Sequence, residues 1–199
     1  MVENETIPNT AELNIEDYIS AINFLAESKS DFLFNNSKPD LAAIVMAAII
    51  NHSDDEIRIY DHSLNGDISS KHSSLLESII HSLERGKKIK LALQKEIKCK
   101  SEICNKLTEY MQEYPKGLDI RIVNETFRNN IKAVVGKDIY FTVGDNDAYR
   151  METTEDSTNS RRGICSFNGP DISKKLIKAF DKEFKHCPKY NPATFIVSI

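Results

Sequence analysis

The sequence lacks the features that would place the protein in a membrane, in a secretory pathway or broadly on nucleic acid. Its longest apolar run, residues 41–50, is far shorter than the ~20 residues that a membrane-spanning helix needs. The first residues, MVENETIPNTAELN, are acidic and polar and do not resemble a signal peptide. The formal charge of −4 provides no global positive field. We therefore expect a cytoplasmic protein with no membrane partner.

Cysteine patterns for metal or disulfide sites are also missing. The four cysteines, Cys99, Cys104, Cys165 and Cys187, include no CxxC pair and form no Cys/His cluster with zinc spacing. We expect free thiols in a reducing compartment, no metal and no cofactor. The rest of the composition, with 40% hydrophobic and 28% charged residues, is typical of one globular domain with a small extension.

The first part of the chain alternates helical and extended patterns. Residues 11–34 have apolar residues at helical spacing and predict one or two amphipathic helices, with a break at residues 35–39. From Pro39 onward the pattern predicts, in order, a helix to residue 50, a strand 55–60, a helix 73–85, a strand 88–93, a helix 101–114 and a strand 118–123. Short connections between these units favour a parallel sheet with right-handed crossovers.

The second part of the chain has the pattern of antiparallel hairpins. It predicts short strands at 131–135, 138–143, 147–153 and 164–167, and a closing helix at 171–186. We expect an α/β protein whose mixed sheet has helices on both faces. Its parts would be an N-terminal helical extension (1–37), an α/β domain (38–187) and a C-terminal tail (188–199).

One hairpin, YFTVGDNDAYRMET at residues 140–153, carries several acids, an arginine and a tyrosine, with no histidine, cysteine or lysine beside them. Arg150 and Glu152 are two residues apart on a strand and share a face, and Tyr149 points to the other. The pair is either a buried structural ion pair or a site where Arg150 binds a phosphate or carboxylate, with Asn168 as a second donor. The ligand-binding candidates are Tyr149, Arg150, Glu152 and Asn168.

The order of elements resembles one half of the phospholipase D superfamily over residues 38–187. The stretches that carry this resemblance are IRIYD, YFTVGDNDAYRME, SFNGP and LIKAFDKEF. The superfamily motif is HxKxxxxD, followed on the next strand by a serine and asparagine element. When Asp145 is placed on the motif's aspartate, Asp138 stands at the histidine position and Tyr140 at the lysine position.

The resemblance is to diverged, single-domain prokaryotic members without the intact motif. Such a resemblance implies a homodimer that associates through the face holding the motif. It also implies an accessory setting such as phage defence or another mobile-element system, and a partner protein from the same locus.

The superfamily's chemistry is not feasible with these replacements. It uses one histidine to attack phosphorus and another to protonate the leaving oxygen. A carboxylate at Asp138 would repel the phosphate, and Tyr140 is neutral at pH 7 and would not balance the developing charge. We therefore expect a catalytically degenerate binding or assembly subunit.

Two alternatives belong to other functional classes. The first is an active phosphodiesterase or nuclease, in which Asp61 and His62, at the carboxyl end of a strand, join Asp145 in a titratable cluster. In the simpler interpretation, His62 is an exposed loop residue. A metal-dependent form would use the acids Asp61, Asp138, Asp145, Asp147 and Glu152.

The second alternative is a nucleic-acid or nucleotide-binding protein. It would use the basic side chains of Lys87, Lys88, Lys90 and Arg150. Because its net charge is negative, this protein would bind nucleic acid only through a local surface.

Overall fold

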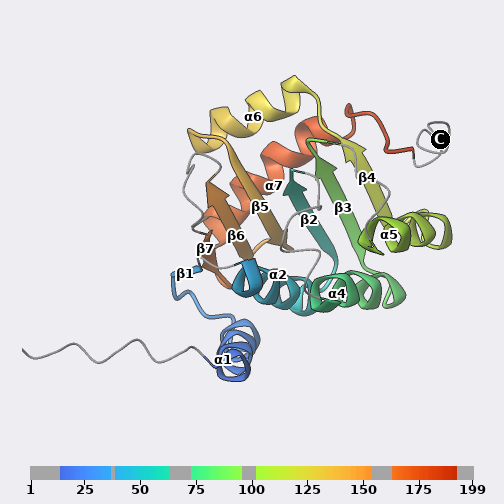
Figure 1. Cartoon of the computed structure of the whole chain (residues 1–199). Coiled ribbons are helices and arrows are strands. Elements are labelled where there is room, and N and C mark those ends of the chain that lie inside the picture. The colour runs from blue at the N-terminus through green and yellow to red at the C-terminus, as the bar shows by residue number, and fades with distance from the viewer. Residues whose placement is uncertain (1–13, 37–38, 63–72, 96–101, 154–162, 192–199) are drawn as a thin grey trace, which may run out of the picture.

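The computed structural model describes residues 14–36, 39–62, 73–95, 102–153 and 163–191, and the fold is given for these residues (Figure 1). The strands are β1 (Phe34–Asn36), β2 (Glu56–Asp61), β3 (Lys88–Leu93), β4 (Leu118–Ile122), β5 (Ile139–Gly144), β6 (Ala148–Thr153) and β7 (Gly163–Ser166). The helices are α1 (Ile15–Glu27), α2 (Pro39–His52), α4 (Ser73–Glu84), α5 (Glu102–Glu113), α6 (Glu125–Val135) and α7 (Pro170–Phe184).

All the described strands form a single seven-stranded mixed sheet, in the order β1-β7-β6-β5-β2-β3-β4. Strands β2, β3 and β4 are parallel, as the short β-α units predict. Strand β5 runs antiparallel to β2 and pairs Phe141 with Tyr60 and Gly144 with Ile57. Strands β6, β7 and β1 continue the antiparallel half.

Helices cover both faces of the sheet, which confirms the predicted fold class (Figure 1). On one face, side chains of α2, α4 and α5 pack on β2, β3 and β4 around the fully buried Ile57, Leu75 and Ile89. On the other face, α6 and α7 pack on β5 and β6 through an aromatic cluster that includes Phe127, Phe141 and Phe180. These two cores hold the strand ends, and therefore the candidate site, in place.

The N-terminal residues contribute a helix and an edge strand. Asn14 caps α1, and Ile22 and Ala26 pack this helix on α2. Residues 34–36, which the sequence pattern divided between a helix and a break, form β1 and pair with β7. The Phe34 ring stacks on Phe167 at 6.0 Å, so contacts with a distant part of the chain determine this edge strand.

Residues 131–135 do not form the predicted short strand and instead complete α6. The Asn124 side chain caps this helix by accepting a hydrogen bond from the Phe127 N–H at 2.9 Å. Phe127 and Ile131 lie one turn apart and are both buried, and Gly136 ends the helix with a φ of 86°. Capping and helical spacing therefore override the β-branched composition of IKAVV.

Beyond α7, the described part of the tail runs alongside β4. The Tyr190 N–H donates to the Ile120 carbonyl at 2.9 Å, and the Tyr190 ring is buried. Residues 192–199 of the predicted tail, and residues 1–13 of the predicted extension, lie outside the described residues. Among the described helices, none has both the length and the hydropathy for crossing a bilayer.

Candidate functional site

The residues expected to act together lie at opposite ends of the sheet. Asp61 ends β2 and His62 follows it, whereas Asp145 follows Gly144, which pairs with Ile57 at the start of β2. The Asp145 N–H bonds to the Glu56 carbonyl at the start of β2, so the antiparallel pairing separates Asp145 from His62 by the whole of β2, about 20 Å of strand. The structure therefore does not bring Asp145 together with Asp61 and His62.

A hydrogen-bonded polar cluster surrounds His62 at the end of the sheet where β2 and β3 finish, hereafter the carboxyl edge. His62 Nδ1 lies 3.1 Å from the Tyr140 hydroxyl and 3.3 Å from Gln94 Oε1. The Tyr140 hydroxyl donates to Gln94 Oε1 at 3.1 Å, and Gln94 Nε2 donates to the Tyr60 hydroxyl at 2.6 Å. The side chains of Tyr60, His62, Gln94 and Tyr140, hereafter the carboxyl-edge cluster, come from the ends of β2 and β3 and the start of β5.

Charged side chains flank the carboxyl-edge cluster. Burial raises the pKa of Tyr60, although hydrogen bonds from Gln94 and Arg128 and the charge of Arg128 act in the opposite direction. Asp138 lies 3.8 Å from Lys132 on α6. The phenol of Tyr60 is therefore neutral at pH 7, and α6 supplies the cations near this edge. The cluster has the donors and acceptors to hold a polar or anionic ligand.

Sequence reasoning did not find Gln94 or Arg128. Gln94 follows β3, and only the parallel pairing of β3 with β2 brings it beside His62. Arg128 lies on α6, which the sequence pattern did not predict as a helix, so no local signal placed this guanidinium at the sheet edge.

Asp145 has a structural role at the opposite edge. Its carboxylate accepts hydrogen bonds from the N–H groups of Asp54, Asp55 and Glu56 at 2.6, 3.0 and 3.2 Å. Its own N–H donates to the Glu56 carbonyl at 3.0 Å, and its φ of 46° is in the left-handed region. Asp145 thus joins the β5–β6 turn to the segment that enters β2.

Arg150 and Glu152 form the buried ion pair that was one of the two sequence interpretations. Arg150 is 4% and Glu152 3% exposed, and their side chains meet at 2.8 Å. Arg150 Nε also donates to Asn36 Oδ1 at 3.3 Å. A Cβ at Gly163 would lie 2.9 Å from the Arg150 guanidinium, so only glycine leaves room for this pair. Neither residue presents a charge to a surface ligand.

Tyr149 and Asn168 do not join this pair. Tyr149 points to the other face, as predicted, but it is 1% exposed, and burial raises the pKa of its hydroxyl. The ring packs so closely that a Cβ at Gly169 would lie 2.4 Å from it. Asn168 is exposed after β7, whereas the hydrogen-bond partners of Arg150 are Asn36 and Glu152. The four ligand-binding candidates therefore form no common pocket.

The predicted basic set is also dispersed. The buried Lys87 ammonium donates to the carbonyls of Ile50 and Asn51 at 3.4 and 3.1 Å, at the end of α2. Lys90 pairs with Glu56 and Asp181, at 3.1 and 3.0 Å. Arg150 is buried as well and Lys90 is half-buried, so Lys88 is the most exposed of the four.

The acids proposed for metal catalysis are divided between the two edges and the Arg150 pair. Asp61 and Asp138 lie at the carboxyl edge, and Asp145 and Asp147 in the turn at the opposite edge. Within the described ranges, no group of three or more His, Cys, Asp or Glu side chains is arranged to hold a metal ion.

Two cations and two carboxylates form an ion network between the sheet and α7. The sequence pattern did not indicate this network. Arg58 contacts both Glu56 and Asp181, and Lys90 contacts the same two carboxylates. Burial alone would raise the pKa of Asp181, but hydrogen bonds from Arg58 and Lys90 lower it below its usual value. This network attaches α7 to β2 and β3.

Comparison with known proteins supports the fold. No family model and no curated protein sequence matches the chain. Nuc from Salmonella typhimurium, a phospholipase D family member, has a TM-score of 0.58 and 11% identity over 80% of this chain and 98% of Nuc. NucT from Helicobacter pylori has a TM-score of 0.54 and 12% identity over 80% of this chain and 100% of NucT.

A third structure is TrmBL2, an archaeal chromatin protein described as showing a novel mode of DNA binding. Its TM-score is 0.57 and its identity 14%, over 88% of this chain and 61% of TrmBL2. The chain therefore spans only part of the length of that protein. At such identities the likeness concerns the fold alone. The chain has a mixed α/β fold similar to that of the phospholipase D family member Nuc.

Proposed function

We propose that the chain is a binding or assembly subunit built on a phospholipase D-like fold and that it does not cleave phosphodiesters. One observation carries this proposal: the Tyr140 hydroxyl, at the position where the resemblance puts the motif's lysine, bonds to Gln94 and lies beside His62. A neutral phenol has replaced the ammonium group that would balance charge on phosphorus. At the histidine position, Asp138 supplies a carboxylate instead of a nucleophilic imidazole.

Hydrolysis assays test this proposal directly. The purified chain is incubated with bis(p-nitrophenyl) phosphate and with single- and double-stranded DNA and RNA, with EDTA, Mg²⁺ or Mn²⁺. We expect no turnover above the blank. The matched variants are His62→Ala in the carboxyl-edge cluster and His81→Ala, an exposed histidine on α4. Turnover that His62→Ala removes and His81→Ala retains would refute the non-catalytic assignment.

The second candidate is a phosphodiesterase that uses His62. The observation in its favour is that Tyr140 and Gln94 hold the imidazole through Nδ1, which is how partner groups orient catalytic histidines. To balance the charge of the phosphate, this enzyme would need the guanidinium of Arg128, which lies near Tyr60 in the carboxyl-edge cluster. It predicts that Tyr140→Phe and Gln94→Leu lower turnover without removing it, whereas His62→Ala removes it.

The third candidate is a DNA-binding subunit, which the likeness to TrmBL2 supports at the level of fold. A fluorescently labelled duplex, titrated at several salt concentrations, tests it because contacts to phosphates make affinity fall steeply with salt. Arg128→Ala and Lys132→Ala would weaken such binding at the carboxyl edge. No binding at low salt would remove this candidate.

Homodimerisation and an accessory role in phage defence or another mobile-element system complete the proposal. The resemblance to single-domain prokaryotic members supports both. Sedimentation equilibrium tests homodimerisation. The comparison variant is Tyr140→Arg, which places a charge in the carboxyl-edge cluster, the face through which the dimer is expected to form. The accessory role requires a phage challenge of cells with and without the chain.

A further inference from the structure

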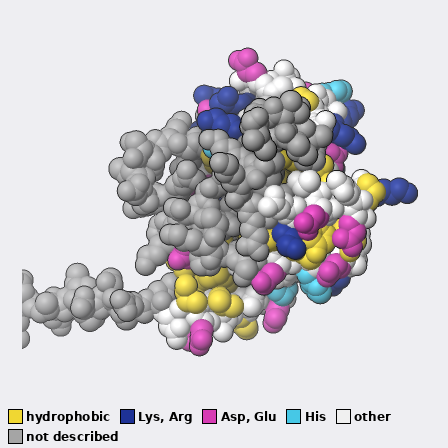
Figure 2. Space-filling view, turned by 45° about the vertical axis from the view of Figure 1, so that its right-hand side comes forward, with side chains coloured by type: hydrophobic (Ala, Val, Ile, Leu, Met, Phe, Trp, Pro, Cys, Tyr) yellow, Lys and Arg dark blue, Asp and Glu magenta, His cyan; other side chains and the backbone are white. Residues whose placement is uncertain are grey.

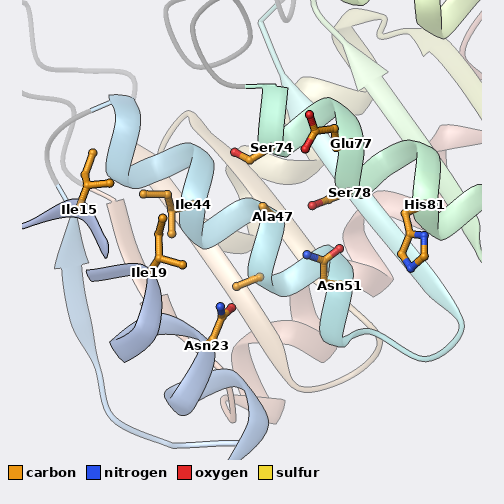
Figure 3. A pocket seen from close by; sticks show the side chains of 11 residues that line it. Ile15, Ile19, Asn23, Ile44, Ala47, Asn51, Ser74, Glu77, Ser78 and His81 are labelled. Atoms are coloured by element: carbon orange, nitrogen blue, oxygen red, sulfur yellow. The ribbon is translucent and has the colours of Figure 1, made fainter. Parts of the chain in front are cut away.

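A groove with an apolar floor lies among α1, α2 and α4, away from the carboxyl-edge cluster (Figure 3). Its volume is about 500 Å³. Ile15 and Ile19 of α1 and Ile44 and Ala47 of α2 form the apolar part, and Glu77 of α4 lies on the rim. Ile15 is 43% and Ile19 38% exposed, so two large apolar side chains of α1 remain uncovered within the groove.

The three helices around the groove carry only one sign of formal charge. They contain no lysine or arginine, and their acidic residues are Glu16, Asp17, Glu27, Asp40, Glu77 and Glu84. Residues 1–84 as a whole have 15 Asp and Glu against 4 Lys and Arg, a formal charge of −11. The remaining residues have 15 against 22, a formal charge of +7. The groove therefore lies in the acidic half of a strongly polarised chain.

The surface view agrees with this composition. In the lower part of Figure 2, where α1 lies, hydrophobic side chains are exposed beside acidic ones. An apolar strip bordered by carboxylates repels an anionic lipid surface. It attracts a partner that combines apolar side chains with lysine or arginine.

The most lysine-rich helix that the structure describes does not supply such a partner in a second copy. Helix α7 is the most lysine-rich described helix, with Lys174, Lys175, Lys178 and Lys182. Its apolar residues Leu176, Phe180 and Phe184 are already buried against the sheet. It therefore cannot place an apolar stripe in the groove of another copy.

We infer that this groove binds an amphipathic helix of a partner protein, with an apolar stripe flanked by lysine or arginine side chains. Helix-in-groove recognition places apolar anchors at i, i+3 or i+4 and i+7, which suits a groove lined by helices. The inference names a partner class for the binding role proposed above but rests on different residues. Detection of phosphodiesterase turnover would overturn that function and leave the groove assignment standing.

The probe is a synthetic peptide of about 14 residues, the length of α2, made of leucine and lysine with the leucines at helical spacing. Two comparison peptides keep its length. One replaces every lysine with glutamate, and the other keeps the composition but scrambles the leucine positions. Binding is measured by fluorescence anisotropy with the full chain. We expect only the first peptide to bind, with an affinity that falls as salt rises.

Two pairs of variants locate the binding. Ile19→Asp in the groove should weaken the leucine–lysine peptide by about tenfold or more. Phe24→Asp is the control, because Phe24 is on the same helix, is 69% exposed and does not line the groove. Glu77→Lys should weaken binding and reduce its salt dependence, whereas Glu113→Lys on α5 should do neither. Circular dichroism confirms that each variant is folded.

Four results would overturn the inference. The first is that the leucine–lysine peptide does not bind. The second is that the leucine–glutamate or scrambled peptide binds equally well. The third is that Phe24→Asp has the same effect as Ile19→Asp. The fourth is that Ile19→Asp converts a dimeric chain to a monomer without peptide, or abolishes binding to vesicles of anionic lipid, because a second copy or a membrane would then be the occupant.

Discussion

The carboxylate of Asp145 accepts a hydrogen bond at 2.6 Å from the backbone N–H of Asp54, 91 residues earlier in the chain. Two further N–H groups, of Asp55 and Glu56, bind the same carboxylate. Hydrogen bonds to an ionised acceptor are stronger than those between neutral groups. The acidic turn that first suggested an active site is therefore a connection that holds the hairpin to the start of β2.

Asp145→Ala should lower the free energy of unfolding by about 2–3 kcal/mol, because it removes an ionised acceptor that three backbone N–H groups share. Asp145→Asn should cost less, about 1 kcal/mol, since asparagine keeps one acceptor and tolerates a φ of 46°. Urea unfolding measures both. Asp147→Asn, in the same turn, is the control and should change stability by less than about 0.5 kcal/mol. Equal effects at the two positions would contradict the structural role of Asp145.

The Arg150–Glu152 pair predicts a strongly non-additive double-mutant cycle. Arg150→Met removes the guanidinium that pairs with the buried Glu152 carboxylate and should cost about 3–5 kcal/mol. Adding Glu152→Leu removes the buried carboxylate that paired with Arg150 and should restore a large part of the loss. Chemical denaturation of the two single variants and the double variant gives the coupling energy. Additive losses would show that the pair is not a coupled unit.

The lowered pKa of Asp181 predicts that the protein loses stability in acid. Its pKa is lowered in the folded protein, so its stabilising contribution is present above the usual aspartate pKa of about 3.9 and is lost as pH falls through the lower folded value. Between pH 6 and pH 3 the wild type should therefore lose more stability than Asp181→Asn. Asp31→Asn, at an exposed position, should behave like the wild type. An acid profile unchanged by Asp181→Asn would argue against the network.

Cys165 should be unreactive in the folded protein. It is 1% exposed, and burial raises its pKa to about 12, so almost no thiolate forms at neutral pH. Iodoacetamide labelling followed by peptide mass spectrometry should find Cys165 unmodified in native buffer and modified in urea. Rapid modification of the native protein would show that β7 opens readily.

The amino-acid sequence by itself determined most of the secondary structure and the division of the sheet. The strand KIKLAL was predicted with its observed bounds, because its apolar residues make a short buried run bounded by turns. The prediction for 131–135 was wrong because a five-residue window rich in β-branched residues does not reveal the Asn124 cap or the spacing of Phe127 and Ile131. The same-face placement of Arg150 and Glu152 followed from the two-residue period of a strand.

Only the tertiary structure decided which end of the sheet each polar residue occupies. The pairing of β5 antiparallel to β2 sends Asp145 to one edge and leaves Tyr140 beside His62 at the other. Gln94 and Arg128 reach that second edge through strand order and helix packing, neither of which leaves a local signal in the sequence. Strand direction and order arise from burial of both faces of the sheet, a property of the whole chain that no short segment encodes.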